Sequence, residues 1–176
     1  MALLRISALR RFSIRALSIA LVAIAGLCSA QELPKGWTIP AVKLTRQAFR
    51  QKDTNRFLAA TGDFNGDGMQ DKALILLNKG TSKLGLFVCL TTAKGCDWHR
   101  LAEMDSAFLD VMGIGTVKSG KYETACGKGY WQCGKDEPET LVTKRDAIEF
   151  FKDESASSVY VYNPRKHAFT SIATSD

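Results

Sequence analysis

One nine-residue stretch constrains this chain more than any other feature of its sequence. Asp63-Phe-Asn-Gly-Asp-Gly-Met-Gln-Asp71 places oxygen-bearing side chains at its first, third, fifth and ninth positions. The expected ligands are the side chains of Asp63, Asn65, Asp67 and Asp71 and, at the seventh position, the backbone carbonyl of Met69. Ca²⁺ prefers about six to eight oxygen ligands, and short loops with this spacing supply them. The sequence therefore predicts a calcium-binding loop over residues 63–71, with Gly68 at the sharp turn in its sixth position.

The residues that follow distinguish two classes of calcium loop. An EF-hand has a bidentate Glu at position twelve and a helix on each side, whereas this chain has Leu74 inside the apolar run 72–77, which is typical of a buried strand. The stretch from Gly62 to Asp71 instead resembles the D-x-[DN]-x-D-G-x-x-D turn of FG-GAP and VCBS repeats, and the resemblance covers about residues 57–77. It implies a Ca²⁺ site between two strands. The Phe-Gly and Gly-Ala-Pro signatures are absent and the motif occurs once, so no propeller is expected. An Asx-rich hairpin turn that binds no metal is the alternative.

The first thirty residues are typical of an export signal. Four arginines precede an apolar run from Ala16 to Leu27, which is too short to span a bilayer, and Ala30 is a small residue suited to cleavage. We therefore expect a cleavable signal peptide over 1–30 and a periplasmic protein without a transmembrane segment, with secretion as the second choice. In an alternative, Cys28 carries a lipid anchor, but the bulky Leu27 before it disfavours this modification.

The charge of the chain argues against a nucleic-acid partner. Of 24 Lys and Arg residues four lie in the leader, whereas all 18 Asp and Glu residues lie after it, so the remaining chain carries a net charge of about +2. Its Lys and Arg residues are scattered among acids, and nucleic-acid binding usually requires a clustered basic surface. We therefore expect no nucleic-acid binding.

Four cysteines remain after the leader, and they form two local pairs. Cys89 lies close to Cys96, and Cys126 lies close to Cys133. Four cysteines allow three pairings, and an oxidising compartment favours disulfides, of which the two local ones fit best. Each bridge would close a loop of eight residues and stabilise the fold by about 2.5 kcal/mol. Zinc is the alternative, although the spacing matches no common zinc pattern and the two histidines, His99 and His167, lie far apart in sequence.

The pattern along the rest of the chain predicts one domain. Residues 31–55 form a lead-in with a possible short helix over 42–51, and residues 56–176 form a single β-rich domain. The expected strands are 56–61, 72–78, 84–90, 108–117, 140–143, 147–151, 157–162 and 168–173, with a strand or short helix at 97–104. We therefore expect a mainly β fold, an antiparallel β-sandwich or flattened barrel stapled by disulfides, with at most one short N-terminal helix.

A second candidate site lies inside the later cysteine pair. Cys126-Gly-Lys-Gly-Tyr-Trp-Gln-Cys133 carries Lys128, Tyr130 and Trp131 on a short segment. Aromatic and cationic side chains on a rigid loop are typical of protein-binding hot spots, so we predict a partner-binding role for these three residues. In the alternative, the two aromatic rings belong to the core.

No catalytic group stands out in the sequence. His99 and His167 are expected to be solvated or half-buried, and no carboxylate pair can be assigned without geometry. Small exported β-rich proteins of this kind resemble periplasmic lysozyme inhibitors and immunity proteins against cell-wall toxins, a resemblance of size, compartment and architecture. The leading expectation is a non-enzymatic calcium-binding protein that binds a cell-wall hydrolase or toxin. The alternatives are a hydrolase that uses unlocated carboxylates and a purely structural calcium-binding module.

Overall fold

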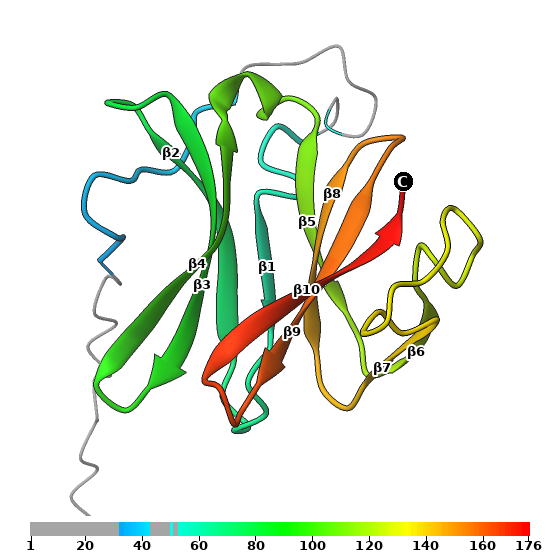
Figure 1. The fold of residues 1–176 in the computed structure, drawn as a ribbon. Helices are drawn as coiled ribbons and strands as arrows, with labels where there is room; N and C mark the ends of the chain where they lie inside the picture. Colours follow the sequence, from blue (N-terminus) through cyan, green and yellow to red (C-terminus); the bar gives the residue numbers. More distant parts are fainter. Residues whose placement is uncertain (1–31, 43–49, 51–52) are drawn as a thin grey trace, which may run out of the picture. The chain divides into compact units, whose positions relative to one another are not determined.

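The chain folds into antiparallel β-sheets. The computed structural model describes residues 32–42, 50 and 53–176 (Figure 1). Sheet A has the strand order β1-β2-β3-β4, and its strands are β1 (Ala59–Gly62), β2 (Asp71–Asn78), β3 (Lys83–Thr92) and β4 (Gly95–Asp105). Sheet B has the order β10-β9-β8-β5, and its strands are β5 (Met112–Val117), β8 (Ala147–Lys152), β9 (Ser157–Asn163) and β10 (Ala168–Ser175). A separate hairpin pairs β6 (Gly120–Glu123) with β7 (Thr140–Thr143).

This architecture confirms the predicted mainly β, antiparallel fold. No α-helix occurs in the described residues, and the 3-10 turn η2 (Ser106–Phe108) leads towards β5. The segment 97–104, for which the sequence left strand and helix open, is part of β4. The possible short helix over 42–51 falls mostly on residues outside those described, as does the expected signal peptide.

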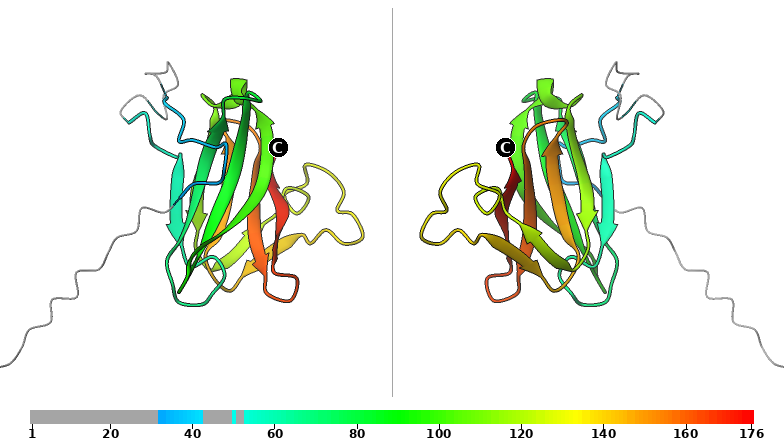
Figure 2. Two further views of the ribbon diagram at one scale, coloured as in Figure 1. Left: turned by 90° about the vertical axis from the view of Figure 1, so that its left-hand side faces the viewer. Right: turned by 90° about the vertical axis from the view of Figure 1, so that its right-hand side faces the viewer.

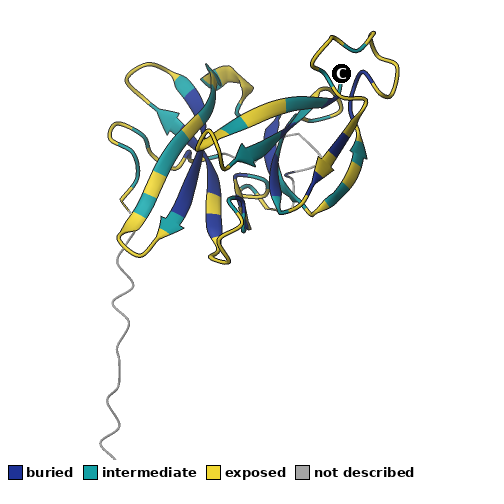
Figure 3. Ribbon diagram, turned by 60° about the horizontal axis from the view of Figure 1, so that its bottom comes forward, coloured by how far each residue is buried: buried dark blue, intermediate teal, exposed yellow. Residues whose placement is uncertain are grey.

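The two sheets share one hydrophobic core. Figure 3 shows buried stretches, in dark blue, on the strands of both sheets. The residues of this core include Ile75, Val88, Ile114, Ile148 and Phe150. Beside β1 and β5 the two sheets are linked directly, because the amide of Ile114 donates to the carbonyl of Phe57 over 2.9 Å. At the opposite side β4 and β10 are the edge strands (Figure 2). The result is a sandwich closed along one side.

Sheet A is covered on its second face by the lead-in. Trp37 packs edge-on against Phe87 with ring centroids 4.7 Å apart, and Trp98 donates its indole N–H to the carbonyl of Glu32 over 3.0 Å. Thr38 and Leu77 exchange backbone hydrogen bonds of 2.9 and 2.8 Å. Strands buried on both faces have continuous apolar runs, which is why β2 and β3 lack a polar–apolar alternation.

The β6–β7 hairpin covers part of the outer face of sheet B. Leu141 of β7 packs with Ala147 of β8 and Val159 of β9, and Tyr122 of β6 joins this second cluster. The sequence predicted β7 at its observed bounds but missed β6, because Gly-Lys-Tyr-Glu contains one apolar residue and shows no strand pattern.

The two predicted disulfides are confirmed. Cys89–Cys96 crosses the β3–β4 hairpin, and Cys126–Cys133 lies in the long connection between β6 and β7. All four thiols are therefore used in disulfides, which excludes the zinc alternative.

Candidate calcium loop and disulfide loop

The Asp63 loop, residues 63–71, joins β1 to β2 and is organised by its first residue. One carboxylate oxygen of Asp63 accepts the amide N–H groups of Gly66 and Asp67 over 2.7 and 3.1 Å, and the other accepts that of Gly68 over 2.9 Å. Gly68 has a φ of +84°, as expected for the sixth position. Asp63 therefore closes the loop around its own carboxylate.

Asn65 and Asp67 extend this network on the exposed side of the loop. The Asn65 amide donates to the Asp67 carboxylate over 2.8 Å, and its oxygen accepts the Asp67 N–H over 3.0 Å. The other Asp67 oxygen accepts the N–H of Met69 over 2.8 Å. Three of the predicted side-chain ligands, including Asp63, thus belong to one hydrogen-bonded network.

Asp71, the first residue of β2, is buried and has a different environment. One of its oxygens accepts the N–H of Thr91 on β3 over 2.8 Å, and the other accepts that of Phe64 over 2.9 Å. Burial raises the pKa of the Asp71 carboxyl, and the hydrogen bonds from Thr91, Phe64 and Asn65 partly counter this rise. Asp71 therefore ties the loop to the centre of sheet A.

The donor set fits the chemistry of calcium. It consists of oxygen atoms, three of them on carboxylates, one on an amide and one on the backbone of Met69, and hard cations prefer such ligands. In the described part of the chain no group of three or more His, Cys, Asp and Glu side chains is arranged to hold a metal ion. The predicted set relies on Asn65 and on a carbonyl as well, and it remains a prediction.

One further residue at this loop was not predictable from the sequence pattern. Arg145, in the turn between β7 and β8, donates its guanidinium to the carbonyl of Asn65. A Cβ added to Gly66 would lie 3.0 Å from this guanidinium, so the glycine makes room for it. Asp63, Lys144 and Asp146 complete a hollow of about 360 Å³ here. Arg145 therefore connects the loop of sheet A to the turn that enters sheet B.

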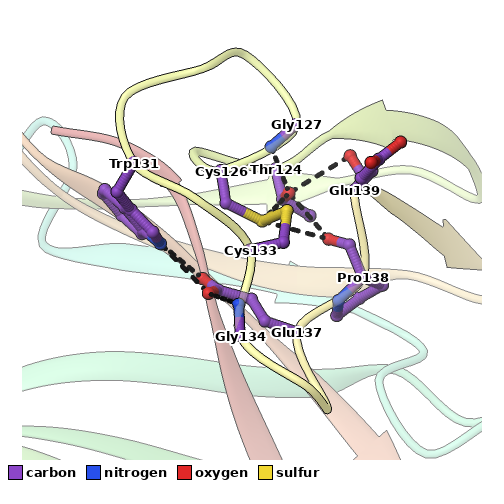
Figure 4. Close-up of a disulfide and its surroundings, with 9 residues drawn as sticks. All are labelled: Thr124, Cys126, Gly127, Trp131, Cys133, Gly134, Glu137, Pro138 and Glu139. Carbon is purple, nitrogen blue, oxygen red and sulfur yellow. Dashed lines mark hydrogen bonds between the residues drawn. A yellow bond between two sulfur atoms is a disulfide. The ribbon is translucent and has the colours of Figure 1, made fainter.

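The disulfide loop, residues 124–139, is the connection between β6 and β7, and Figure 2 shows it extending away from the sheets. Its base is closed by the buried Thr124, whose hydroxyl donates to the carbonyl of Pro138 over 2.7 Å and accepts the N–H of Gly127 over 3.1 Å (Figure 4). The disulfide Cys126–Cys133 closes the segment above this base. Covalent and polar contacts therefore hold the loop together.

The two aromatic residues of the disulfide loop are exposed and are not core residues. Tyr130 is 54% and Trp131 is 38% exposed. The Trp131 indole N–H lies 3.1 and 3.0 Å from the two carboxylate oxygens of Glu137, and the same carboxylate accepts the N–H of Gly134 over 3.2 Å (Figure 4). The indole ring is therefore held in place while it faces solvent.

Lys128 turns back from the loop towards sheet B. Its ammonium donates to the carbonyl of Thr174 over 2.7 Å, and the N–H of Ala125 donates to the carbonyl of Ala173 over 2.9 Å. These two bonds anchor the disulfide loop to β10. Lys128 therefore contacts β10, whereas Tyr130 and Trp131 face solvent, and the partner-binding role of all three residues stays a prediction.

A larger hollow lies between this loop, the β6–β7 hairpin and the outer face of sheet B. We call it the β6–β10 hollow; it has a volume of about 690 Å³. Its lining includes Lys118, Lys121, Glu123, Lys128, Glu149 and Ser157. The sequence pattern offered no signal for this site, because its walls come from five strands and the disulfide loop.

The two histidines lie at the β4 and β10 side of the sandwich. The Nε2 atom of His99 lies 3.0 Å from a carboxylate oxygen of Asp97. The His99 ring meets the Phe169 ring edge-on, with ring centroids 6.2 Å apart. His167 has its Nδ1 3.2 Å from the hydroxyl of Tyr162.

Comparison with known proteins finds no matching family model, no similar curated protein and no similar solved structure. Within the described ranges no helix has the length and apolar character needed to cross a membrane.

Proposed function

We propose that this chain is an exported calcium-binding protein without enzymatic activity, which binds a macromolecular partner through its disulfide loop. The partner that fits best is a cell-wall hydrolase or toxin, so that the protein acts as an inhibitor or immunity protein. The choice of partner rests on the resemblance in size, architecture and expected compartment described above. Two disulfides are consistent with an oxidising compartment.

The observation that carries this proposal is the exposed pair Tyr130–Trp131 on a rigid loop. Binding usually costs free energy to order side chains, and preorganised loops reduce that cost. Here the disulfide fixes the backbone and Glu137 fixes the indole of Trp131. Exposed aromatic residues held in this way are typical hot spots of protein interfaces.

Calcium has a structural role in this proposal. Asp63, Asp67 and Asp71 lie within nine residues of chain, and a cation would reduce the repulsion among their carboxylates. Because the ion would bind the folded loop, it would stabilise the domain by mass action. The Asp63 loop and the disulfide loop are different connections of the chain. Calcium therefore stabilises the domain, and Tyr130 and Trp131 bind the partner.

The proposal is tested with purified lysozyme and other cell-wall hydrolases. We expect the wild-type protein to inhibit at least one of them in a peptidoglycan-turnover assay, and Trp131→Ala or Tyr130→Ala to weaken inhibition by about 30-fold, as for a hot-spot residue. Ile39→Ala is the matched control, because Ile39 is a 62% exposed apolar residue of the lead-in. Equal inhibition by Trp131→Ala and the wild type, or no inhibition of any enzyme tested, would contradict the proposal.

A hydrolase remains the second candidate, and one observation favours it. The β6–β10 hollow contains two carboxylates, Glu123 on β6 and Glu149 on β8. Paired carboxylates are the groups that glycoside hydrolysis requires. Turnover of peptidoglycan by the wild type that Glu149→Gln abolishes would favour this candidate over the inhibitor.

A further inference from the structure

The β6–β10 hollow has the size of a small-ligand site. Pockets for small molecules usually measure about 300–1,000 Å³ and combine apolar walls with a few polar groups, and this one measures about 690 Å³. Its apolar part includes Val117 of β5 and Val159 of β9, both within the cluster beneath the β6–β7 hairpin. A ligand in the hollow would therefore contact valine side chains that are already held in place by this cluster.

On the wall formed by β6 and the disulfide loop, Lys121 and Lys128 accompany one carboxylate, Glu123, so the wall keeps a net positive charge and has unused donors. Lys128 uses one of its three ammonium protons on the carbonyl of Thr174, which leaves two for a ligand. Lys121 of β6 is exposed, and its ammonium has no hydrogen bond or ion pair among the residues that the structure describes. Lys118 differs, because its ammonium pairs with Asp146 over 2.9 Å. Lys121 and Lys128 are therefore the cations free to bind a carboxylate.

The floor of the hollow carries the opposite charge. Glu149 of β8 is paired in register with Gly115, and its carboxylate would lie 3.6 Å from a Cβ added to that glycine. The carboxylate therefore lies over the outer face of sheet B, and within the described residues it has no ion pair. Beside it the Ser157 hydroxyl lies 2.7 Å from that of Thr174 and 2.9 Å from that of Ser175, which gives the floor polar groups for further hydrogen bonds.

We propose that the β6–β10 hollow binds a small ligand with both an acidic and a basic group, of the short-peptide class. Lys121 and Lys128 bind its carboxylate, Glu149 binds its ammonium group, and Val117 and Val159 contact an apolar side chain between them. A single amino acid would leave most of the volume empty, whereas a peptide of a few residues would fill it. This inference does not depend on the partner proposed for the disulfide loop.

Three forms of one peptide test the proposal by NMR titration. The probe is alanyl-leucyl-alanine with free termini, compared with the same peptide acetylated at its N-terminus and with the same peptide amidated at its C-terminus. Because a charge-assisted hydrogen bond is roughly twice as strong as a neutral one, we expect each modification to weaken binding by about 10-fold or more. Amide signals of β6, β8 and β9 should shift on binding.

Two variants test which residue binds each terminus of the peptide. We expect Lys121→Met to weaken binding of the free peptide by about 10-fold and to leave binding of the amidated peptide nearly unchanged, because that peptide has no carboxylate to lose. Glu149→Gln should weaken binding of the free peptide and leave binding of the acetylated peptide nearly unchanged. Lys94→Met, in the exposed turn between β3 and β4, is the control and should match the wild type.

Three outcomes would overturn this assignment. The first is no shift with the free peptide up to about 10 mM, which corresponds to binding too weak for a built site. The second is equal binding of all three peptides. The third is loss of binding on amidation but not on acetylation, which would assign the hollow to a purely anionic ligand.

Discussion

The Asp63 loop and the disulfide loop are both rigid, but different interactions hold them. In the Asp63 loop the carboxylates of Asp63 and Asp71 accept backbone N–H groups, and the buried ring of Phe64 packs in the core. In the disulfide loop a covalent bond and the buried hydroxyl of Thr124 do the same task. We therefore expect charge and cations to affect the first loop, and redox conditions to affect the second.

In the function we propose, the Asp63 loop stabilises the domain and the disulfide loop binds the partner. The Asp63 loop ends at the buried Asp71 in sheet A, so a change in the loop conformation directly affects the packing of that sheet. The disulfide loop extends from a two-stranded hairpin and carries exposed aromatic rings. We expect changes to the first loop to alter the free energy of unfolding, and changes to the second to alter binding.

Asp71→Ala should have the largest effect on stability. It removes the acceptor of the buried N–H of Phe64 and of the part-buried N–H of Thr91, and each unsatisfied buried donor costs about 1–3 kcal/mol. We expect a loss of about 3–4 kcal/mol in urea unfolding with chelator present. Asp67→Ala is the control, because the Asp67 side chain is exposed and should cost about 1 kcal/mol. Equal losses for the two variants would show that Asp71 does not tie the loop to the core.

Removing the disulfide of the second loop should have the next largest effect. The double variant Cys126→Ser, Cys133→Ser should lose about 2.5 kcal/mol in chain-entropy terms and retain the calcium response of the wild type. The double variant Cys89→Ser, Cys96→Ser opens a loop of the same length and serves as the matched control, since it should leave the environment of Trp131 unchanged. A changed calcium affinity in the first variant would break the separation between the loops.

Calcium itself should act on the first loop. At a free concentration about ten times the dissociation constant, it should stabilise the folded protein by about 1.4 kcal/mol, measured as a higher urea midpoint than in chelator. Asp67→Ala should abolish this gain. An identical midpoint with calcium and with chelator in the wild type would contradict the predicted calcium site.

Two glycines allow the finest comparison. Gly68 and Gly129 both have a φ of +84°, and a Cβ added at either position meets no atom within 4 Å. Ala at each position should therefore cost the same backbone strain, about 1 kcal/mol. In calorimetry only Gly68→Ala should weaken calcium binding, and only Gly129→Ala should weaken binding of the hydrolase partner. A calcium effect in both variants would indicate that the loops are coupled.

Local features of this fold were predictable from the sequence. The contacts inside the Asp63 loop span at most a few residues, so the spacing of Asp63, Gly68 and Asp71 already indicates its turn. The apolar runs of β2 and β3 predict a buried hairpin, and the close spacing of the cysteines predicts their pairing.

Long-range contacts were not predictable in this way. Arg145 meets Asn65 across 80 positions, and the buried guanidinium of Arg50 donates to the carbonyls of Leu109 and Met112, which are 59 and 62 positions away. An arginine in the sequence looks the same whether it faces solvent or crosses between sheets. The β6–β10 hollow has the same origin, because its residues meet only after β8 and β10 have paired with β9 and the β6–β7 hairpin has packed on sheet B.

The packing of the lead-in on sheet A has a spectroscopic consequence. The chain has three tryptophans. Trp37 and Trp98 lie with Phe87 in one cluster, where the lead-in packs on sheet A. Trp131 lies exposed on the disulfide loop. In a Trp131→Phe variant the tryptophan fluorescence would therefore come only from Trp37 and Trp98, and it would report detachment of the lead-in from sheet A. Subtracting the emission of this variant from that of the wild type gives the emission of Trp131. A soluble quencher should reduce that emission in the free protein and should have less effect when a partner covers the ring.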